Sequence, residues 1–322
     1  MNFKRIAGLA FACLAAFSFN VAAQSYPAKP VKIIIPYPPG GGIDFIGRVA
    51  GEKLSARWGQ PVVVENRTGA SGAIGSEAAA KSEADGYTLL VMPIDLMLNP
   101  SLVQNPRFDP LKDLAPIAVL ATSTQIIAAH GASGIRTLAD LVARAKAEPG
   151  KISFSSCGNG SPGQLIGETL KARANVDMTH VPYKGCAPAV TDAVGGQVQL
   201  TIGGTGTVAQ YIKSGRRNAL AVASPQRDPQ YGEIPTAMES GFAEVSMTNW
   251  FGLFAPAATK PEVIEKISAD LAAIYADPVF RKSIADRTLN PLFTPTAPFA
   301  KLIASDVERF RALMKQLGIK AD

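Results

Sequence analysis

The stretch PYPPGGGID, Pro36 to Asp44, places three consecutive glycines between an apolar run, VKIII, and an amphipathic segment. Glycine amides have no Cβ beside them, so such a run can turn several N–H groups towards one anion. The helix that follows adds a partial positive charge at its amino-terminal end. A phosphate loop would continue with Gly-Lys-Ser/Thr, whereas Ile43 and Asp44 follow here. The pattern predicts a site for a small carboxylate, and the alternative is a purely structural turn.

Asp44 has two interpretations. Its carboxylate can cap the helix that begins beside it, or it can accept a hydrogen bond from a ligand ammonium or hydroxyl. If Asp44 lines the site, its negative charge repels a carboxylate placed too close, so it would fix which end of a ligand points inward.

A second glycine-rich helix entrance follows a strand at SSCGNGSPGQL, residues 155–165. It matches G-x-G-x-x-G, the dinucleotide fingerprint, but Pro162 interrupts the approach to the helix and the acid expected later, Asp177, is misplaced. We therefore expect another set of bare amides and hydroxyls that faces the first across a cleft. The groups it offers are Ser155, Ser156, Gly158, Gly160 and Ser161.

A third candidate is GGTGTVAQYI, residues 203–212, where Thr205 either contacts a ligand or begins a capped helix. Catalytic chemistry finds little support. His130 and His180 are the only histidines, and neither has a metal-ligand spacing with Cys, Asp or Glu. GASGA, residues 69–73, misses the final glycine of a nucleophile elbow. We expect no catalytic residue, no metal and no cofactor.

The elements that must position these loops alternate between strand and helix along the chain. Strands are predicted at VKIII, PVVVEN, YTLLVM, STQIIAAH, KISFSS, MTHVPY, VQLTIGG, ALAVAS and WFGLFAPA. Helices are predicted over 43–58, 138–147 with Thr137 as its cap, 164–174, 188–195, 261–275 and 298–317. Repeated β-α units indicate an α/β fold with parallel sheets covered by helices.

The amino terminus indicates export. Lys4 and Arg5 precede an apolar run of about 16 residues that ends in Val21-Ala22-Ala23, whereas a membrane-spanning anchor, the alternative, needs roughly 20. Removing residues 1–23 takes away two basic residues and no acid, so the net charge falls from +6 to +4. A mild positive field favours anionic ligands, and without a basic run or stripe we expect no nucleic-acid partner.

Length and cysteine content bound the architecture. At 322 residues, with 47% hydrophobic and 18% charged residues, the chain is an ordinary globular protein that fits two domains. Cleavage leaves Cys157 and Cys186, which in an oxidising compartment are expected to pair; two buried free thiols are the alternative.

Several segments together resemble the periplasmic solute-binding receptors of tripartite tricarboxylate transporters, the Bug-type receptors. They are YPAKPVKIIIPYPPGGGIDFIGRVAGEKL, GQPVVVENRTGASGAIG, ADGYTLL, GKISFSSCGNGSPGQLIGETL, HVPYKGCAPAVTDAVGGQV, ALAVAS and NWFGLFAPA. The resemblance spans almost all of the mature chain. It implies a two-lobe Venus-flytrap of type II-like periplasmic-binding fold. The lobes would comprise 24–122 with about 255–322, and about 123–254.

The resemblance also implies a function. A cleft between the lobes would close on a small carboxylate (a dicarboxylate, amino acid or aromatic acid) and a monomeric receptor would deliver it to membrane transporter subunits. A secreted α/β enzyme acting on a carboxylated substrate, and a sensory module, are the alternatives. Contacts carried over by motif are Tyr37, Gly41, Gly42, Ile43 and Asp44 in the first lobe and Ser156, Gly158, Gly160, Ser161 and Thr205 in the second.

Two positions depart from the family pattern. Ile43 stands where the family often has a small hydroxyl residue, and Gln164 where a histidine is common. Both leave the identity of the ligand open. Cys157 and Cys186 fall in the two second-lobe motifs, so a bridge between them would stiffen the loop that meets the ligand.

Overall fold

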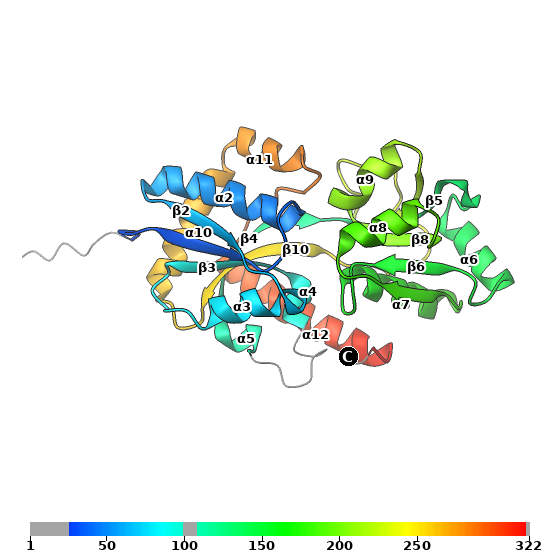
Figure 1. The fold of residues 1–322 in the computed structure, drawn as a ribbon, viewed down its shortest axis with the longest axis horizontal. Coiled ribbons are helices and arrows are strands. Elements are labelled where there is room, and N and C mark those ends of the chain that lie inside the picture. The colour runs from blue at the N-terminus through cyan, green and yellow to red at the C-terminus, as the bar shows by residue number, and fades with distance from the viewer. Residues whose placement is uncertain (1–25, 99–107, 320–322) are drawn as a thin grey trace, which may run out of the picture.

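A six-stranded sheet forms the first half of the molecule, here called the first lobe. The computed structural model describes residues 26–98 and 108–319, and Figure 1 shows two sheets side by side within them. The strand order is β11-β4-β10-β3-β1-β2. The strands are β1 (Val31–Ile35), β2 (Val62–Asn66), β3 (Thr88–Pro93), β4 (Leu114–Ser123), β10 (Asn249–Pro256) and β11 (Thr294–Pro295). β1 runs parallel to β2 and β3, whereas β10 is antiparallel to both β3 and β4.

Helices cover both faces of this sheet, because its central strands are apolar on both sides. They are α2 (Gly42–Trp58), η1 (Ala70–Gly72), α3 (Ala73–Ala80), α4 (Ile94–Leu98), α5 (Pro110–Asp113), α10 (Pro261–Tyr275), α11 (Pro278–Ala285) and α12 (Thr296–Gln316). α2, α10 and α11 share one core with residues such as Ile33 and Val91. α3, α4 and α12 lie on the other face, where Trp250, Phe254 and Phe299 pack together.

A five-stranded sheet of order β7-β6-β8-β5-β9 forms the second lobe. Its strands are β5 (Gln125–His130), β6 (Ser153–Ser156), β7 (Thr179–Pro182), β8 (Leu200–Gly204) and β9 (Arg217–Val222). Its helices are η3 (Gly131–Ser133), α6 (Leu138–Ala147), α7 (Pro162–Ala174), α8 (Cys186–Val194) and α9 (Thr205–Lys213). Thr137 caps α6 as predicted, because its hydroxyl accepts from the amide of Asp140, and the Asp140 side chain completes a capping box.

The chain passes from the first sheet to the second between β4 and β5, and it returns to the first sheet at β10. The predicted boundary near 255 falls inside β10, all of which belongs to the first sheet. The apolar run of β10 is buried between β3 and β4, a pairing of segments far apart in sequence. The predicted leader, residues 1–23, lies outside the described residues. Within the described part of the chain, no helix combines the length and the apolar character needed to cross a membrane.

Candidate functional site

The strand directions bring one set of loops from each lobe to the boundary between them. In the first lobe, β1 leads through α2 to β2 on one side, while β3, its neighbour on the other side, leads away through α4. Ligands of open α/β sheets bind in the crevice where neighbouring connections diverge in this way. The crevice therefore lies between the loop after β1, which contains Tyr37 to Gly41, and the start of α4.

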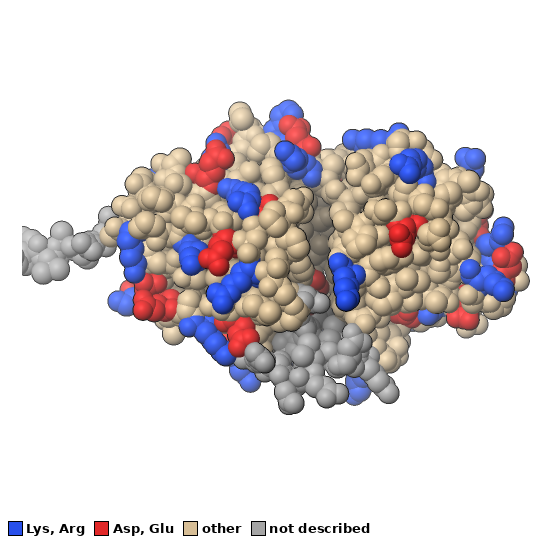
Figure 2. Space-filling model, in the orientation of Figure 1, with Lys and Arg blue, Asp and Glu red and all other residues tan. Residues whose placement is uncertain are grey.

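The second lobe has the same arrangement. β6 leads through α7 to β7, and its neighbour β8 leads through α9 to β9 on the opposite side. The diverging loops are residues 156–161 and 203–205, both identified from the sequence. Figure 2 shows a furrow between the two halves of the molecule, lined mainly by uncharged residues in that view. The predicted residues of the two lobes thus belong to loops that end at the same boundary.

The amino-terminal end of α2 is open. Gly41 occupies the N-cap position and provides no side-chain acceptor. The helical hydrogen bonds begin with the amide of Phe45, which donates to the carbonyl of Gly41 at 3.0 Å. The amides of Gly42, Ile43 and Asp44 precede that bond, so no helical carbonyl is available to them. A Cβ built on Gly41 meets no atom within 4 Å, so the space beside Gly41 is open.

The carboxylate of Asp44 is hydrogen-bonded to other groups of the protein. Its carboxylate accepts hydrogen bonds from the Gly40 amide at 3.0 Å, from Arg48 Nε at 2.9 Å and from Asn66 Nδ2 at 2.8 Å. Burial opposes ionisation of this group, but these bonds outweigh it and hold its pKa below the usual value. As an anion, Asp44 therefore holds the Gly40 amide of the glycine loop, and its contact with a ligand stays a prediction.

The side chains of Ile43 and Tyr37 differ in their environment. Ile43 is buried in the core shared by α2 and the sheet, so only its amide lies at the open helix end. Tyr37 is half-buried, with its ring 3.3 Å from the position of a Cβ on Gly72. Its hydroxyl donates to Asp95 Oδ2 at 3.1 Å. Tyr37 thus links the loop after β1 to the residues after β3.

Asp95 was not identified from the sequence. It is the second residue of α4, directly after β3, and it is half-buried at the crevice of the first lobe. Burial raises its pKa to about 6, although the hydrogen bond from Tyr37 and the nearby amides of Asp95 and Leu96 favour its ionised form. Its place in the sequence could have identified it, because Asp95 is the first acidic residue after the predicted strand YTLLVM.

The loop after β6 satisfies most of its own polar groups. Ser161 caps α7 by accepting from the Gln164 amide, and Gln164 Oε1 accepts from the Gly160 amide at 2.7 Å. Ser156 Oγ lies 2.7 Å from His180 Nε2 and 3.0 Å from the carbonyl of Gly158. Burial, with a smaller effect of Lys171, lowers the pKa of His180 to about 4. His180 is therefore neutral near pH 7 and brings no positive charge to this loop.

Cys157 and Cys186 form a disulfide, as the sequence predicted. It joins the loop after β6 to the first residue of α8. The Gly185 amide also donates to the Cys157 carbonyl at 3.0 Å. The loop of the second lobe is thereby held at two points to the start of α8.

Thr205 contacts the other lobe. Its hydroxyl donates to the carbonyl of Thr288, in the loop between α11 and β11, at 2.6 Å. Two more bonds cross here: Gln230 Nε2 donates to the Leu289 carbonyl at 3.2 Å, and Asn290 Nδ2 donates to Asp228 Oδ2 at 3.0 Å. We call residues 288–290 the inter-lobe strap. The strap also touches the open helix end, because a Cβ on Gly42 would meet Leu289 at 3.3 Å.

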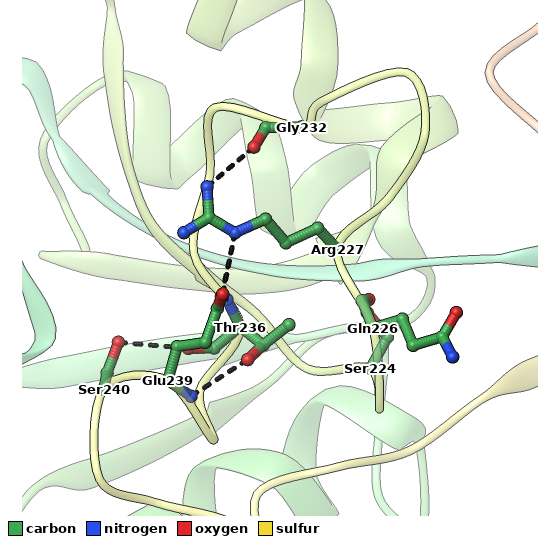
Figure 3. Close-up of polar contacts among 7 residues, drawn as sticks. All are labelled: Ser224, Gln226, Arg227, Gly232, Thr236, Glu239 and Ser240. Carbon is green, nitrogen blue, oxygen red and sulfur yellow. Dashed lines mark hydrogen bonds and ion pairs between the residues drawn. The ribbon is translucent and has the colours of Figure 1, made fainter.

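A polar network holds the second-lobe partners of the strap in place. Figure 3 shows Arg227 bonded to Glu239 and to the carbonyl of Gly232, with Thr236 bonded to Glu239 and Ser240. These bonds fold residues 224–240 into a compact loop after β9. Asp228 and Gln230 lie within this loop, which therefore presents them to the first lobe.

Other features of the described residues lie apart from the inter-lobe boundary. A depression of about 770 Å³ is lined by β9, the start of α6 and the end of α9. It includes none of the predicted site residues. In residues 26–98 and 108–319, no three His, Cys, Asp or Glu side chains are grouped so as to hold a metal ion.

Comparisons with known proteins agree with this geometry. Residues 46–319 match the model of the "Tripartite tricarboxylate transporter family receptor". Protein BugT of Bordetella pertussis is 32% identical over 99% of both chains. The structure of R. palustris Rpa4515 with adipate is 28% identical, covers 92% of this chain and 100% of its own, and has a TM-score of 0.85. MatC from Rhodopseudomonas palustris with bound malate is 25% identical, with 89% and 99% covered and a TM-score of 0.79.

The match to the family model covers most of the chain, and the BugT alignment covers nearly all of it. The two mixed sheets correspond to the two-lobe fold of periplasmic binding proteins, as the resemblance implied. These proteins are solute receptors of transporters and not enzymes. The chain belongs to the tripartite tricarboxylate transporter receptor family.

Proposed function

We propose that this receptor captures a small carboxylate between its lobes and that the open amino-terminal end of α2 receives the carboxylate group. The observation that supports this most strongly is the set of amides at Gly42, Ile43 and Asp44, which lie without helical acceptors at the first-lobe crevice. The start of α9 also lacks a side-chain cap. Relatives whose structures contain adipate or malate bind ligands of this class.

Closure of the lobes provides the signal that a transporter reads. A ligand that touches both lobes binds the closed arrangement more tightly and shifts the hinge equilibrium towards it. A micromolar dissociation constant corresponds to about −8 kcal/mol. Two or three charge-assisted hydrogen bonds to backbone amides supply about 3–9 kcal/mol before the cost of association, so contacts from the second lobe must supply the remainder. The second lobe would contribute the loop of Ser156 to Ser161, whose position the disulfide restricts.

The receptor acts in the periplasm as a monomer after removal of residues 1–23. Its two moving bodies are residues 24–123 with 249–322, and residues 124–248. Its partner is the membrane-embedded part of a tripartite transporter. Intact mass of the exported protein, and its elution volume on a sizing column, test cleavage and oligomeric state.

Titration calorimetry with a panel of mono-, di- and hydroxycarboxylates tests the function. We expect saturable binding of at least one member at micromolar concentration, and recovery of that compound unchanged from the protein by mass spectrometry. A compound that copurifies with the protein would extend the panel. Absence of binding to every carboxylate, or conversion of the bound compound to a product, would contradict a receptor role.

A further inference from the structure

The first-lobe crevice holds charges of both signs within one small region. One wall is the start of α2, with three unpaired amides and the positive end of the helix dipole. The loop beside it is the start of α4, which carries the half-buried Asp95. Because β1 and β3 are neighbours in the sheet, the loops that follow them lie side by side. The bond from the Tyr37 hydroxyl to Asp95 Oδ2 confirms that they touch.

Asp95 lacks the cation that other shielded carboxylates of this lobe have. Asp44, Asp270 and Asp306 each lie within 2.7–3.4 Å of an arginine nitrogen. No ion pair joins Asp95 to any Lys, Arg or His among the described residues, and the neutral Tyr37 is its hydrogen-bonding side chain. A carboxylate withdrawn from water without a positive partner is costly. Its raised pKa, about 6, reflects that cost and still leaves the group mostly ionised at pH 7.

We propose that this crevice selects carboxylates that also carry a protonated amine, with the start of α2 receiving the carboxylate and Asp95 receiving the ammonium group. This inference depends on the proposed function. A zwitterion matches both the start of α2 and Asp95, because each of its charges meets the opposite charge. A ligand with a second carboxylate in the same place would instead be repelled by Asp95.

Ligands that differ only in the amine test whether the site prefers amine-bearing carboxylates to amine-free ones. Succinate, L-malate and L-aspartate share one four-carbon skeleton and differ at one position, which carries hydrogen, hydroxyl or ammonium. Adipate and 2-aminoadipate form a longer pair. Titration calorimetry at pH 7.5 with the full mature protein should show that the amine-bearing member of the preferred length binds about 10- to 100-fold more tightly than the amine-free member, as expected for one charge-assisted bond.

The variant Asp95→Asn keeps the size of the side chain and a partner for Tyr37 but removes the charge. It should lose about 10-fold or more of its affinity for the amine-bearing ligand and change little towards the amine-free one. Asp286→Asn removes one exposed acid of the same lobe, paired only with Lys282, and should leave both affinities unchanged. Circular dichroism checks that each variant is folded.

The outcomes distinguish the two proposals. If the wild-type protein binds succinate, malate or adipate as tightly as the amine-bearing ligands, or if Asp95→Asn leaves the preference intact, the selection by Asp95 is wrong while the carboxylate receptor stands. If none of the five compounds binds but another carboxylate of the wider panel does, the selection by Asp95 is wrong and the carboxylate receptor stands. If no carboxylate of that panel binds, the proposed function fails and the inference fails with it.

Discussion

Gly41 is the residue at which binding and stability can be separated. Its backbone has a φ of −82°, which any residue adopts, and a Cβ there meets no atom within 4 Å. Gly41→Val should therefore leave the melting temperature within about 1–2 °C, while its methyl groups stand in front of the amides of α2 and weaken carboxylate binding at least about 10-fold.

Gly195 is the matched control for this test. Its φ is −72°, and a Cβ there would make only ordinary contacts, at 3.5 Å, with the carbonyl oxygens of Thr191 and Asp192. Gly195 follows the last residue of α8, at the end opposite the disulfide, so Gly195→Val should bind as the wild type does in the same calorimetric titration. Equal affinities for the Gly41 and Gly195 variants would contradict a ligand position at the start of α2.

Asp95 should lower stability at neutral pH. Its pKa in the folded protein, about 6, lies above the ordinary aspartate value of 3.8, so folding favours its protonated form. The contribution of Asp95 to the free energy of unfolding is thus most favourable below about pH 4, and it is lost as the pH rises through 6. Asp95→Asn should raise the free energy of unfolding by about 1–2 kcal/mol at pH 8 and by nearly nothing at pH 4. Urea denaturation of the variant and the wild type at pH 8 and pH 4 measures these free energies. If the variant differs from the wild type by the same amount at both pH values, ionisation of Asp95 is not the cause.

At the level of single residues, the sequence predicts local patterns but not contacts between residues that are distant along the chain. Glycine loops and helix caps are local patterns, so the loops at 40–44 and 156–161 and the cap at Thr137 were predictable. Gly40 and Arg48 are local partners of Asp44, but its third partner, and the partners of Thr205 and Asp95, are distant in sequence. Asn66 lies 22 residues from Asp44, and Thr288 lies 83 residues from Thr205. Ligand contact by the predicted residues remains a prediction.

At the scale of elements, the disulfide joins the loop after β6 to α8 and closes a segment of 29 residues. Constraining such a loop in the unfolded chain is expected to stabilise the fold by about 3 kcal/mol. The double variant Cys157→Ala, Cys186→Ala should lower the free energy of unfolding by about 2–4 kcal/mol in denaturant titrations. A reducing agent should destabilise the wild type similarly and leave the double variant unchanged. A variant as stable as the oxidised wild type would contradict this account.

Most helices and strands followed from hydrophobic periodicity and capping. The helix predicted at 138–147 coincides with α6, and all of WFGLFAPA except its last residue, Ala257, lies within β10. The position of β10 between β3 and β4 was not predictable, because it depends on pairing with segments more than 100 residues away. The same pairing explains why the predicted boundary near 255 falls inside a strand. The irregular loop at 224–240 lacks periodicity and depends on the Arg227 network.

For the whole molecule, the inter-lobe strap should set how easily the lobes separate. The double variant Thr205→Val, Asn290→Ala removes two side-chain donors that bond across the lobes. Without ligand, it should have a larger radius of gyration by small-angle X-ray scattering. Its affinity should fall about 3- to 10-fold, because more of the population is open.

Thr191→Val is the control for the strap. Its hydroxyl donates to the Ala187 carbonyl within α8, so its loss removes a threonine hydroxyl without touching the lobe boundary. Scattering and affinity should match the wild type. If the strap variant also matches the wild type in both measurements, the bonds at 288–290 do not govern opening.

A crystal structure of the mature protein with a bound carboxylate tests the central claim most directly. We expect the ligand to lie between the lobes, with a carboxylate oxygen within about 3 Å of the amide nitrogens of Gly42 and Ile43 and with the loop of Ser156 to Ser161 on its other side. A ligand bound outside the furrow, or within it but with those amides bonded only to protein, would contradict the account.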